Sequence, residues 1–134
     1  MESEDLIYLN ESALISINKR AIKLFEIKKK DKHELMSLYK LAHLVDGCID
    51  FNGDFYEKTV FLTKSIIKSH CFASGNRRTA LLALFLFHAF NNKKLYITDD
   101  PINNKIFLGI REGYYSDDEL SCWIRSGKIK KFKR

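Results

Sequence analysis

The chain has 134 residues, of which 46% are hydrophobic, and a formal net charge of +6. This length predicts one domain, residues 1–134, with a hydrophobic core that needs no disulfide or metal for its stability. With a single proline and so many hydrophobic residues, the chain fits neither the intrinsically disordered class nor the low-complexity class.

The three cysteines, Cys48, Cys71 and Cys122, are odd in number and do not cluster. The sequence has no C-x-x-C or H-E-x-x-H spacing and no signal peptide, which predicts a cytoplasmic protein with reduced thiols and argues against structural zinc. Cys71 follows His70 directly, but neighbours in sequence do not make a catalytic pair, so a thiol nucleophile is disfavoured.

Two helices are predicted in the first third of the chain. Hydrophobic residues from Glu11 to roughly Lys29 recur close to helical spacing, although Asn18 and the later lysines leave the end of this helix open. A clearer amphipathic helix is predicted from Lys32 to Val45, with Gly47 as the residue that stops it.

Residues 48–55, C-I-D-F-N-G-D-F, alternate between apolar and polar side chains around Asn52-Gly53. This pattern is typical of a short β-hairpin, and an ordinary connection between two helices explains it equally well. A strongly apolar helix is then predicted from Phe55 to Ser69.

The next helix is apolar on nearly every side. From Thr79 to Phe90 only Thr79 and His88 are polar, so no amphipathic stripe exists and the helix is expected to be buried all round. The apolar run is far shorter than the roughly 18–20 residues that span a bilayer. The sequence therefore predicts the central helix of a soluble domain, without membrane association.

The start of this helix carries two arginines where cations are unfavourable. Arg77 and Arg78 fall in the first turn, at the positive end of the helix dipole. The same turn offers unpaired backbone N–H groups, and Gly75 before it allows a close backbone approach. Together these groups predict a site for a multiply charged anion such as a phosphate chain, the alternative being two arginines solvated at an exposed helix end.

His70, at the beginning of the preceding loop, is a candidate general base, because histidine titrates near neutrality. If the loop is extended, His70 and Phe72 face the same side, with Phe72 anchored in the core and His70 held near the anion. Taken alone, such a histidine would more often be a structural hydrogen-bonding residue.

After the central helix, Leu95 to Thr98 is expected to be extended. Ile102 to Glu112 is predicted to be a helix with Pro101 in its first turn. Ser116-Asp117-Asp118-Glu119 is a capping box that opens the last helix, and Gly127 ends it. Residues 128–134 form a basic tail, interpreted as a frayed and solvated end, with a nucleic-acid arm or a docking tail for an acidic partner as alternatives.

The string H-C-F-A-S-G-N-R-R-T-A-L, from His70 to Leu81, resembles the H-x-F-x-D-G-N-K-R-T-A-L motif of the Fic/Doc family, closest to its Doc (death-on-curing) branch. The resemblance extends over almost the whole chain and leaves out only the last basic residues. It implies an all-α Fic fold around the buried central helix, with the β-hairpin as a flap that pairs with the backbone of a target protein. Ser74 departs from the motif, because the family usually has an acidic residue there.

The resemblance also implies roles in a transfer from ATP to a Ser or Thr hydroxyl of a target protein. His70 would deprotonate the hydroxyl, Asn76 and the backbone around Gly75 would hold phosphate oxygens, and Arg78 would neutralise charge in the transition state. Ser74 has no charge, whereas hard cations prefer anionic oxygen, but its hydroxyl is the expected contact to Mg²⁺, directly or through water. The residues expected to contact ATP are Ser74, Gly75, Asn76, Arg77 and Arg78.

Arg77 and Leu81 favour one reaction over another. AMP-transferring relatives have glycine and a second arginine at these two positions, whereas a bulky cation at the first resembles Doc-type members, which transfer the γ-phosphate. The resemblance thus implies a kinase. The alternatives are AMP transfer and a catalytically impaired module that binds a nucleotide or a partner.

Inhibition by a second chain is implied as well. Self-inhibited Fic proteins carry S/T-x-x-x-E-G/N in the same chain, but here Leu108 stands at the Ser/Thr position before Glu112-Gly113. The resemblance therefore implies a toxin with a separate antitoxin protein. By analogy with Doc-type members the target would be a translation elongation factor, and the absence of a nucleic-acid motif makes nucleic acid an unexpected partner.

Overall fold

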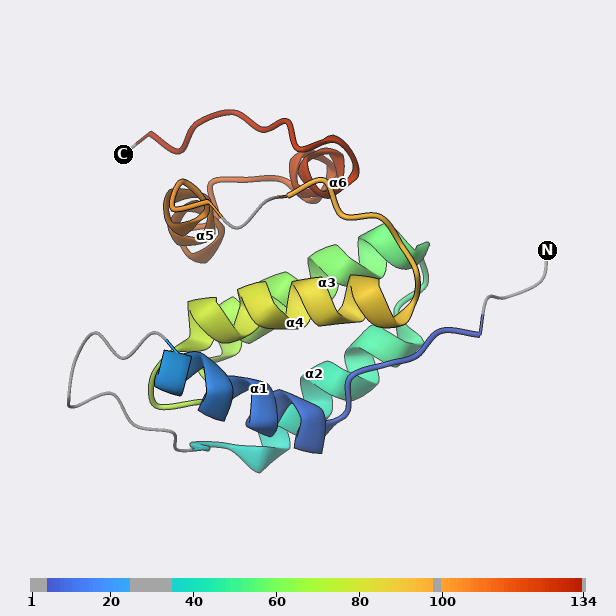
Figure 1. Ribbon diagram of the computed structural model, residues 1–134, viewed down its shortest axis with the longest axis vertical. Helices are drawn as coiled ribbons and strands as arrows, with labels where there is room; N and C mark the ends of the chain where they lie inside the picture. Colours follow the sequence, from blue (N-terminus) through green and yellow to red (C-terminus); the bar gives the residue numbers. More distant parts are fainter. Residues whose placement is uncertain (1–4, 25–34, 98–99, 134) are drawn as a thin grey trace.

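The computed structural model describes residues 5–24, 35–97 and 100–133. In these ranges the chain forms α1 (Glu11–Leu24), α2 (Leu38–Asp50), α3 (Phe55–Ser69), α4 (Asn76–Phe90), α5 (Asn103–Arg111) and α6 (Asp117–Ser126). α3 and α4 lie side by side in the middle, with α1 and α2 on one side of them and α5 and α6 on the other (Figure 1). The predicted all-α class is confirmed.

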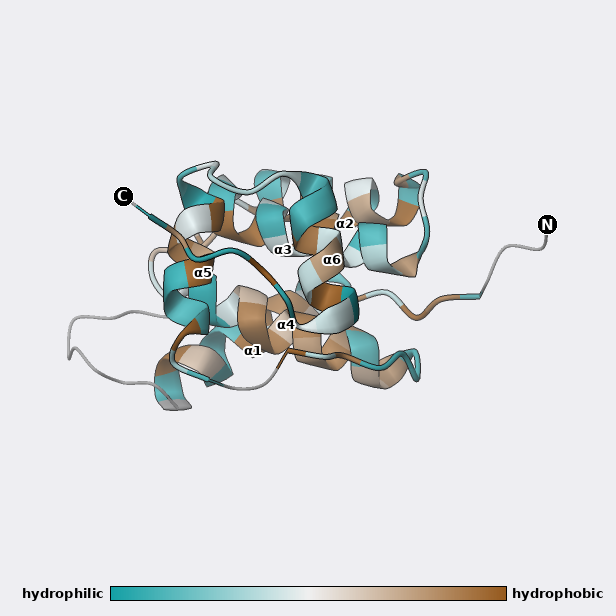
Figure 2. Cartoon of the chain, turned by 90° about the horizontal axis from the view of Figure 1, so that it is seen from above, coloured by the Kyte–Doolittle hydropathy of each residue, from teal (hydrophilic) through white to brown (hydrophobic). Residues whose placement is uncertain are grey.

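α4 is the buried centre of the fold, as predicted. Ala80, Ala83, Leu84 and Phe87 expose none of their surface, and hydrophobic residues follow the helix along its length (Figure 2). Full burial of a side chain such as Leu84 or Phe87 contributes about 1.5–3 kcal/mol. Both ends of the helix reach solvent, because Arg77 in the first turn is exposed and Phe90 in the last turn is 47% exposed. Within the described ranges, none of the helices combines the length and the apolar character that crossing a membrane requires.

α2 begins later than predicted among the described residues and continues past Gly47. Ser37 caps its first turn by accepting a hydrogen bond from the Lys40 backbone N–H at 3.1 Å. A Cβ on residue 47 would lie 2.7 Å from Cζ of Phe61, so the glycine permits close packing between α2 and α3 instead of stopping the helix. Residues 25–34, which carry the predicted end of the first helix and start of the second, lie outside the described residues.

The predicted β-hairpin flap at residues 48–55 is not seen, and the alternative, a helix–helix connection, is what the structure has. The side chain of Asp54 accepts from the N–H of Glu57 at 2.9 Å, and the Glu57 carboxylate accepts from the N–H of Asp54 at 3.1 Å, which forms a capping box that starts α3. The ammonium of Lys58 donates to the carbonyls of Cys48, Ile49 and Phe51 at 2.8–3.0 Å. Because these groups satisfy both helix ends, no strand pairing is needed.

The last helix, α6, is also set by its caps. Ser116 and Glu119 form the predicted capping box of α6, and Gly127 ends the helix with a φ of 78°. The residues between α4 and α5 that were expected to be extended, Leu95 to Ile97, carry no regular secondary structure, and Thr98 lies outside the described residues.

The basic tail is not frayed as predicted, because residues 128–133 pack on α5 and α6. Phe132 lies edge-on to Tyr114 with ring centroids 5.1 Å apart, and the Tyr115 hydroxyl donates to the carbonyl of Lys130 at 3.0 Å. The Lys130 ammonium is 3.0 Å from a carboxylate oxygen of Glu119. The tail therefore belongs to the folded structure.

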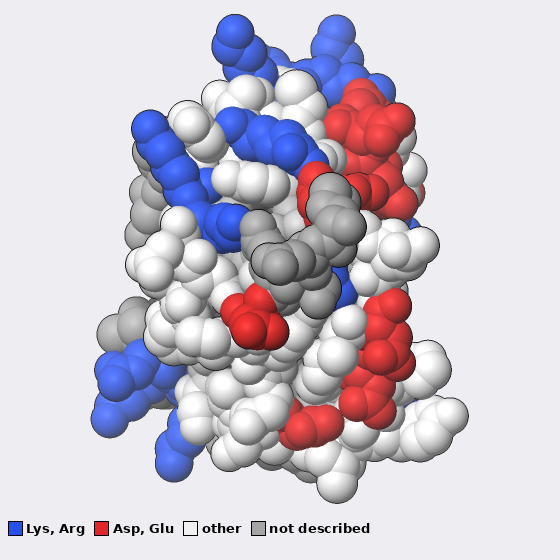
Figure 3. All heavy atoms as spheres, turned by 90° about the vertical axis from the view of Figure 1, so that its right-hand side faces the viewer, with Lys and Arg blue, Asp and Glu red and all other residues white. Residues whose placement is uncertain are grey.

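Charged side chains are unevenly spread over the surface. On the face drawn in Figure 3, Asp and Glu gather along one flank, while Lys and Arg gather at the top and the lower left. The positive net charge is thus concentrated in parts of the surface, and the surface has separate acidic and basic areas that can each bind a partner of opposite charge.

Candidate active site

The loop between α3 and α4 contains the first candidate catalytic residue, His70. It follows the last residue of α3 and has a left-handed backbone, with φ 52° and ψ 46°. A left-handed residue closes a helix end well, but for a side chain other than glycine it costs of the order of 1 kcal/mol. The predicted extended geometry at His70 is therefore wrong, whereas Phe72, 3% exposed, is anchored in the core as predicted.

Gly75 forms the start of α4 and is also left-handed, with φ 76°. A Cβ here would lie 3.1 Å from Cγ1 of Ile22 and 3.5 Å from Nδ2 of Asn18, so the position combines an unusual φ with restricted space. No side chain caps this end of α4. The first turn thus presents backbone N–H groups at the positive end of the helix dipole, which is the arrangement that binds phosphate.

A buried amide from α1 fixes this loop. Asn18 is fully buried, and its Nδ2 donates to the carbonyl of Ser74 at 2.9 Å and to the hydroxyl of Thr79 at 3.0 Å. Asn18 therefore supports the loop of the candidate site, a role that the sequence interpretation missed. Its signal was present, because a polar residue between Leu14 and Ala21 stands on the hydrophobic face of a predicted helix.

Asn76 closes the loop from its other end. Its Nδ2 donates to the carbonyl of Phe72 at 2.9 Å, and its Oδ1 accepts from the N–H of Phe72 at 3.3 Å. The observed contacts give Asn76 a structural role, and its contact with phosphate oxygens stays a prediction. Ser74 and Gly75 lie in this clamped loop, directly before the first turn of α4 with Arg77 and Arg78.

The chain before α2 lies against the same loop. Leu35 and Phe72 form an isolated antiparallel β-bridge, and the N–H of Met36 donates to the carbonyl of Cys71 at 2.7 Å. The backbone of the loop is thus held from outside as well as from α1. Rigid support of this kind is what a site needs to hold its groups in one geometry.

The arginines of α4 belong to a larger cationic cluster. Burial lowers the pKa of the Arg77 guanidinium, and the nearby charges of Arg111 and Arg78 lower it further. Arg111 comes from the last turn of α5, where it also pairs with Glu112 at 3.2 Å. Three guanidinium groups in mutual repulsion are stabilised by an anion between them. No sequence pattern indicated Arg111, because its proximity to Arg77 depends on how α5 packs.

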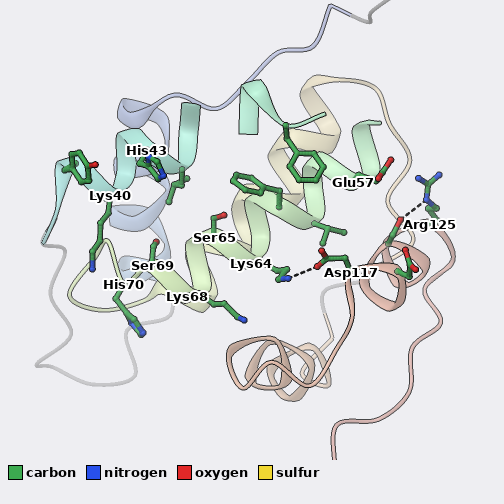
Figure 4. Close-up of a pocket in the computed structure, with 17 residues that line it drawn as sticks. Lys40, His43, Glu57, Lys64, Ser65, Lys68, Ser69, His70, Asp117 and Arg125 are labelled. Atoms are coloured by element: carbon green, nitrogen blue, oxygen red, sulfur yellow. Dashed lines mark hydrogen bonds and ion pairs between the residues drawn. The ribbon is translucent and has the colours of Figure 1, made fainter. Parts of the chain in front are cut away.

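A cavity of about 790 Å³ adjoins the loop at His70 (Figure 4). Its walls come from α2, α3 and α6, and its lining includes His70 but none of the residues from Ser74 to Arg78. His70 therefore lies between two regions, the cationic first turn of α4 and this cavity. A transfer enzyme requires that arrangement, with donor and acceptor brought to one base from different sides.

The described residues do not form a metal site from protein side chains alone. Within them, His, Cys, Asp and Glu nowhere gather in threes in a way that could hold a metal ion. Ser74 offers a neutral hydroxyl, and its carbonyl accepts a hydrogen bond from Asn18. Ser74 as a metal contact stays a prediction.

The chain matches a known protein family. The model of the Fic/DOC family matches residues 8–88, which cover α1 to α4 and the loop with His70 and Gly75. No curated protein is similar enough in sequence to match the chain. The chain therefore belongs to the Fic/DOC family.

Proposed function

We propose that this Fic/DOC-family chain transfers the γ-phosphoryl group of ATP to a Ser or Thr hydroxyl of a target protein, as a Doc-type toxin. The observation that carries the proposal is the first turn of α4, where left-handed Gly75, N–H groups without a side-chain cap, and Arg77 and Arg78 come together, one loop away from His70. A phosphate chain is the common biological anion with enough charge for this cluster.

His70 is the proposed general base. Its imidazole takes the proton of the acceptor hydroxyl while the hydroxyl oxygen forms a bond to the γ-phosphorus. The bond between that phosphorus and the bridging oxygen to the β-phosphate breaks, so that ADP leaves with the bonding electron pair. Arg78 neutralises the charge that builds up on the phosphoryl oxygens, and Arg77 and the backbone N–H groups after Gly75 hold the phosphate chain.

Mg²⁺ would reach the site bound to the phosphates of ATP, whose charge it neutralises when bound. The chain contributes no carboxylate from this loop, because Ser74 stands where the family usually has an acidic residue. We propose that the neutral hydroxyl of Ser74 is the group that contacts the metal. Asn18 keeps the loop in place through its hydrogen bond to the Ser74 carbonyl.

Two alternatives have specific support. AMP transfer uses the same histidine and phosphate site, but Arg77 and Leu81 differ from the AMP-transferring pattern, so we place it second. A binding module without catalysis is favoured by the lack of a carboxylate at Ser74.

Replacement of Arg78 tests whether the first turn of α4 binds the nucleotide. Arg78→Ala should weaken ATP binding, measured by calorimetry, well beyond Arg78→Lys, since lysine keeps the charge and loses the two-pronged contact. Arg20→Ala, on the exposed part of α1, is the matched control. Equal ATP affinity for the wild type and Arg78→Ala would remove Arg78 from the site.

Ser74→Asp separates the enzyme from the binding module. The new carboxylate lies in a loop rich in cations, so we expect tighter Mg²⁺·ATP binding and faster transfer, both lost in EDTA. If the wild type already shows Mg²⁺-dependent transfer and Ser74→Asp slows this transfer, then Ser74 is itself adapted as the contact to the metal. If neither protein modifies any target although ATP binds, the chain is a binding module.

The toxin role and its partners complete the proposal. We expect a separate antitoxin protein, because Leu108 stands where self-inhibited relatives have Ser or Thr. The target is a translation factor by analogy with Doc-type members. The proposed location is the cytoplasm, where Cys48, Cys71 and Cys122, all free, would remain reduced.

A further inference from the structure

The cavity beside His70 is an elongated groove along α3 rather than a compact pocket. Its lining follows α3 from Glu57 to Ser69, with α2 on one side and α6 on the other. Lys68 follows Glu57 by eleven residues on this helix, which corresponds to roughly 16 Å along the helix axis. An extended peptide advances about 3.3 Å per residue, so the groove accommodates about five or six residues.

The floor of the groove is hydrophobic. Leu44 of α2 and Val60 and Phe61 of α3 line it, and Phe51 packs on Phe61 with ring centroids 5.3 Å apart. In the middle, the ammonium of Lys64 is 2.6 Å from a carboxylate oxygen of Asp117, so this ion pair links α3 to α6 and neutralises the centre. Such a floor suits one or two apolar side chains of a bound segment.

The two ends of the groove have opposite charge. Lys40 and Lys68 lie with His70 at one end, and Glu57 lines the other end at the start of α3 (Figure 4). Among the described residues, neither Lys40 nor Lys68 is within ion-pair distance of a carboxylate. At the other end, Arg125 lines the groove and is paired with Asp54, which does not line it. Because Asp54 neutralises Arg125, an excess of negative charge remains at that end.

We propose that this groove binds an extended segment of the target protein and delivers its acceptor hydroxyl to His70. Charge complementarity defines the segment: an acidic residue next to the Ser or Thr, facing Lys40 and Lys68, then apolar residues, then a basic residue facing Glu57. The proposal rests on the proposed function for the identity of the acceptor group. It goes further in stating which sequences around that group are accepted.

The arrangement also explains why the groove is separate from the phosphate site. Arg77, Arg78 and Arg111 already provide a cationic cluster that does not line the groove. The lysines at the His70 end are therefore available to the segment that carries the hydroxyl. An acidic residue there would be attracted to the groove by Lys40 and Lys68.

Direct binding without ATP tests the proposal independently of catalysis. The probes are fluorescent peptides of about six residues, with the order serine, aspartate, leucine, alanine, leucine, lysine, and a second set in which aspartate and lysine are exchanged. Each is made in both chain directions and measured by anisotropy against the full chain. We expect the peptide with aspartate beside serine to bind more tightly than its charge-exchanged partner, in at least one direction.

Charge reversal of the groove gives the sharper result. Lys68→Glu and Lys40→Glu should each weaken binding of the first peptide about threefold to fivefold, as expected for exposed ion pairs, and strengthen binding of the exchanged peptide. Misfolding cannot produce this inversion of preference. Lys19→Glu, which makes the same charge change on exposed α1, should leave both peptides unchanged.

The remaining outcomes overturn the proposal. If both peptides bind equally and the lysine variants do not change their order, the groove does not read this charge pattern. If Lys40→Glu and Lys68→Glu weaken ATP binding as much as Arg78→Ala does, the lysines belong to the nucleotide site. Loss of transfer with intact peptide preference would instead contradict the proposed function and leave the groove assignment in place.

Discussion

Replacing His70 with glycine should preserve or increase the stability of the fold while it removes transfer. His70 has a left-handed backbone, which glycine adopts without the steric cost that a Cβ brings. That cost is about 1–2 kcal/mol, and the greater freedom of glycine in the unfolded chain offsets about 0.4–1 kcal/mol of it. The expected net gain is therefore about 0.5–1 kcal/mol.

Activity should change in the opposite direction. A general base contributes roughly 10²–10⁴-fold to the rate, so His70→Gly should reduce transfer by that factor while ATP still binds to the first turn of α4. In a domain of this size about 1 kcal/mol shifts the melting temperature by roughly 3–5 °C. Thermal unfolding and a transfer assay on the same sample measure both effects.

The chain offers a matched control for the backbone effect. Asn92 is the other described residue outside glycine with a positive φ, at 53°. Asn92→Gly should leave transfer unchanged, with a smaller gain in stability because asparagine tolerates this conformation better than most side chains. If His70→Gly lowers stability by more than about 1 kcal/mol, or if it keeps wild-type transfer, His70 is a structural residue and the assignment of the base is wrong.

Three further predictions test the groups that hold the site and the core. Lys58→Met should lower the free energy of unfolding, measured by urea denaturation, by about 2–3 kcal/mol, because three carbonyls at the end of α2 lose their charged donor. The same change at exposed Lys105 is the control and should cost under about 0.5 kcal/mol. Gly75→Ala should lower the free energy of unfolding by about 1–2 kcal/mol and weaken ATP binding, since the φ of 76° and Ile22 at 3.1 Å both oppose a Cβ. An unchanged ATP affinity would show that the nucleotide does not approach this backbone. Burial lowers the pKa of His88, so the folded state favours the neutral imidazole. The free energy of unfolding should be constant above the unfolded pKa of about 6.5 and should fall as the pH drops from there towards the lowered folded pKa. A His88→Gln variant with the same pH dependence in that range would contradict this.

The helices that the sequence predicted well are those whose ends and faces are locally determined. α3 has the predicted bounds because its apolar residues are dense, and Ser116 and Glu119 predicted the start of α6 because a capping box acts within four residues. α4 was predicted as central because its apolar run has no polar face. The sequence pattern placed Gly75 directly before this helix, and the structure has it as the N-cap residue.

The features that failed depend on contacts between distant residues. The hairpin was predicted from the alternation around Asn52-Gly53, but Lys58 satisfies the end of α2 and Asp54 starts α3, so no strand is required. Gly47 was interpreted as a helix stop, whereas the proximity of Phe61 is what requires a glycine there. The packing of the basic tail through Phe132 on Tyr114 was likewise invisible in a charge pattern.

The site was predicted as a set of residues but not as a geometry. His70 was expected in an extended loop, and its left-handed backbone follows from the way α3 ends. Asn18 and Arg111 join the loop from α1 and α5, and only the packing of the helices brings them there. A motif can indicate which side chains act, whereas their support comes from segments far away in the sequence.

The most direct test of the central proposal follows the label from ATP. The chain is incubated with a cell lysate and Mg²⁺, in parallel with ATP labelled at the α-phosphate and at the γ-phosphate, and with His70→Gly as the control. The proposed phosphoryl transfer predicts a target protein labelled from γ-labelled ATP, not from α-labelled ATP, and only by the wild type. A target labelled from α-labelled ATP would contradict it and establish AMP transfer instead.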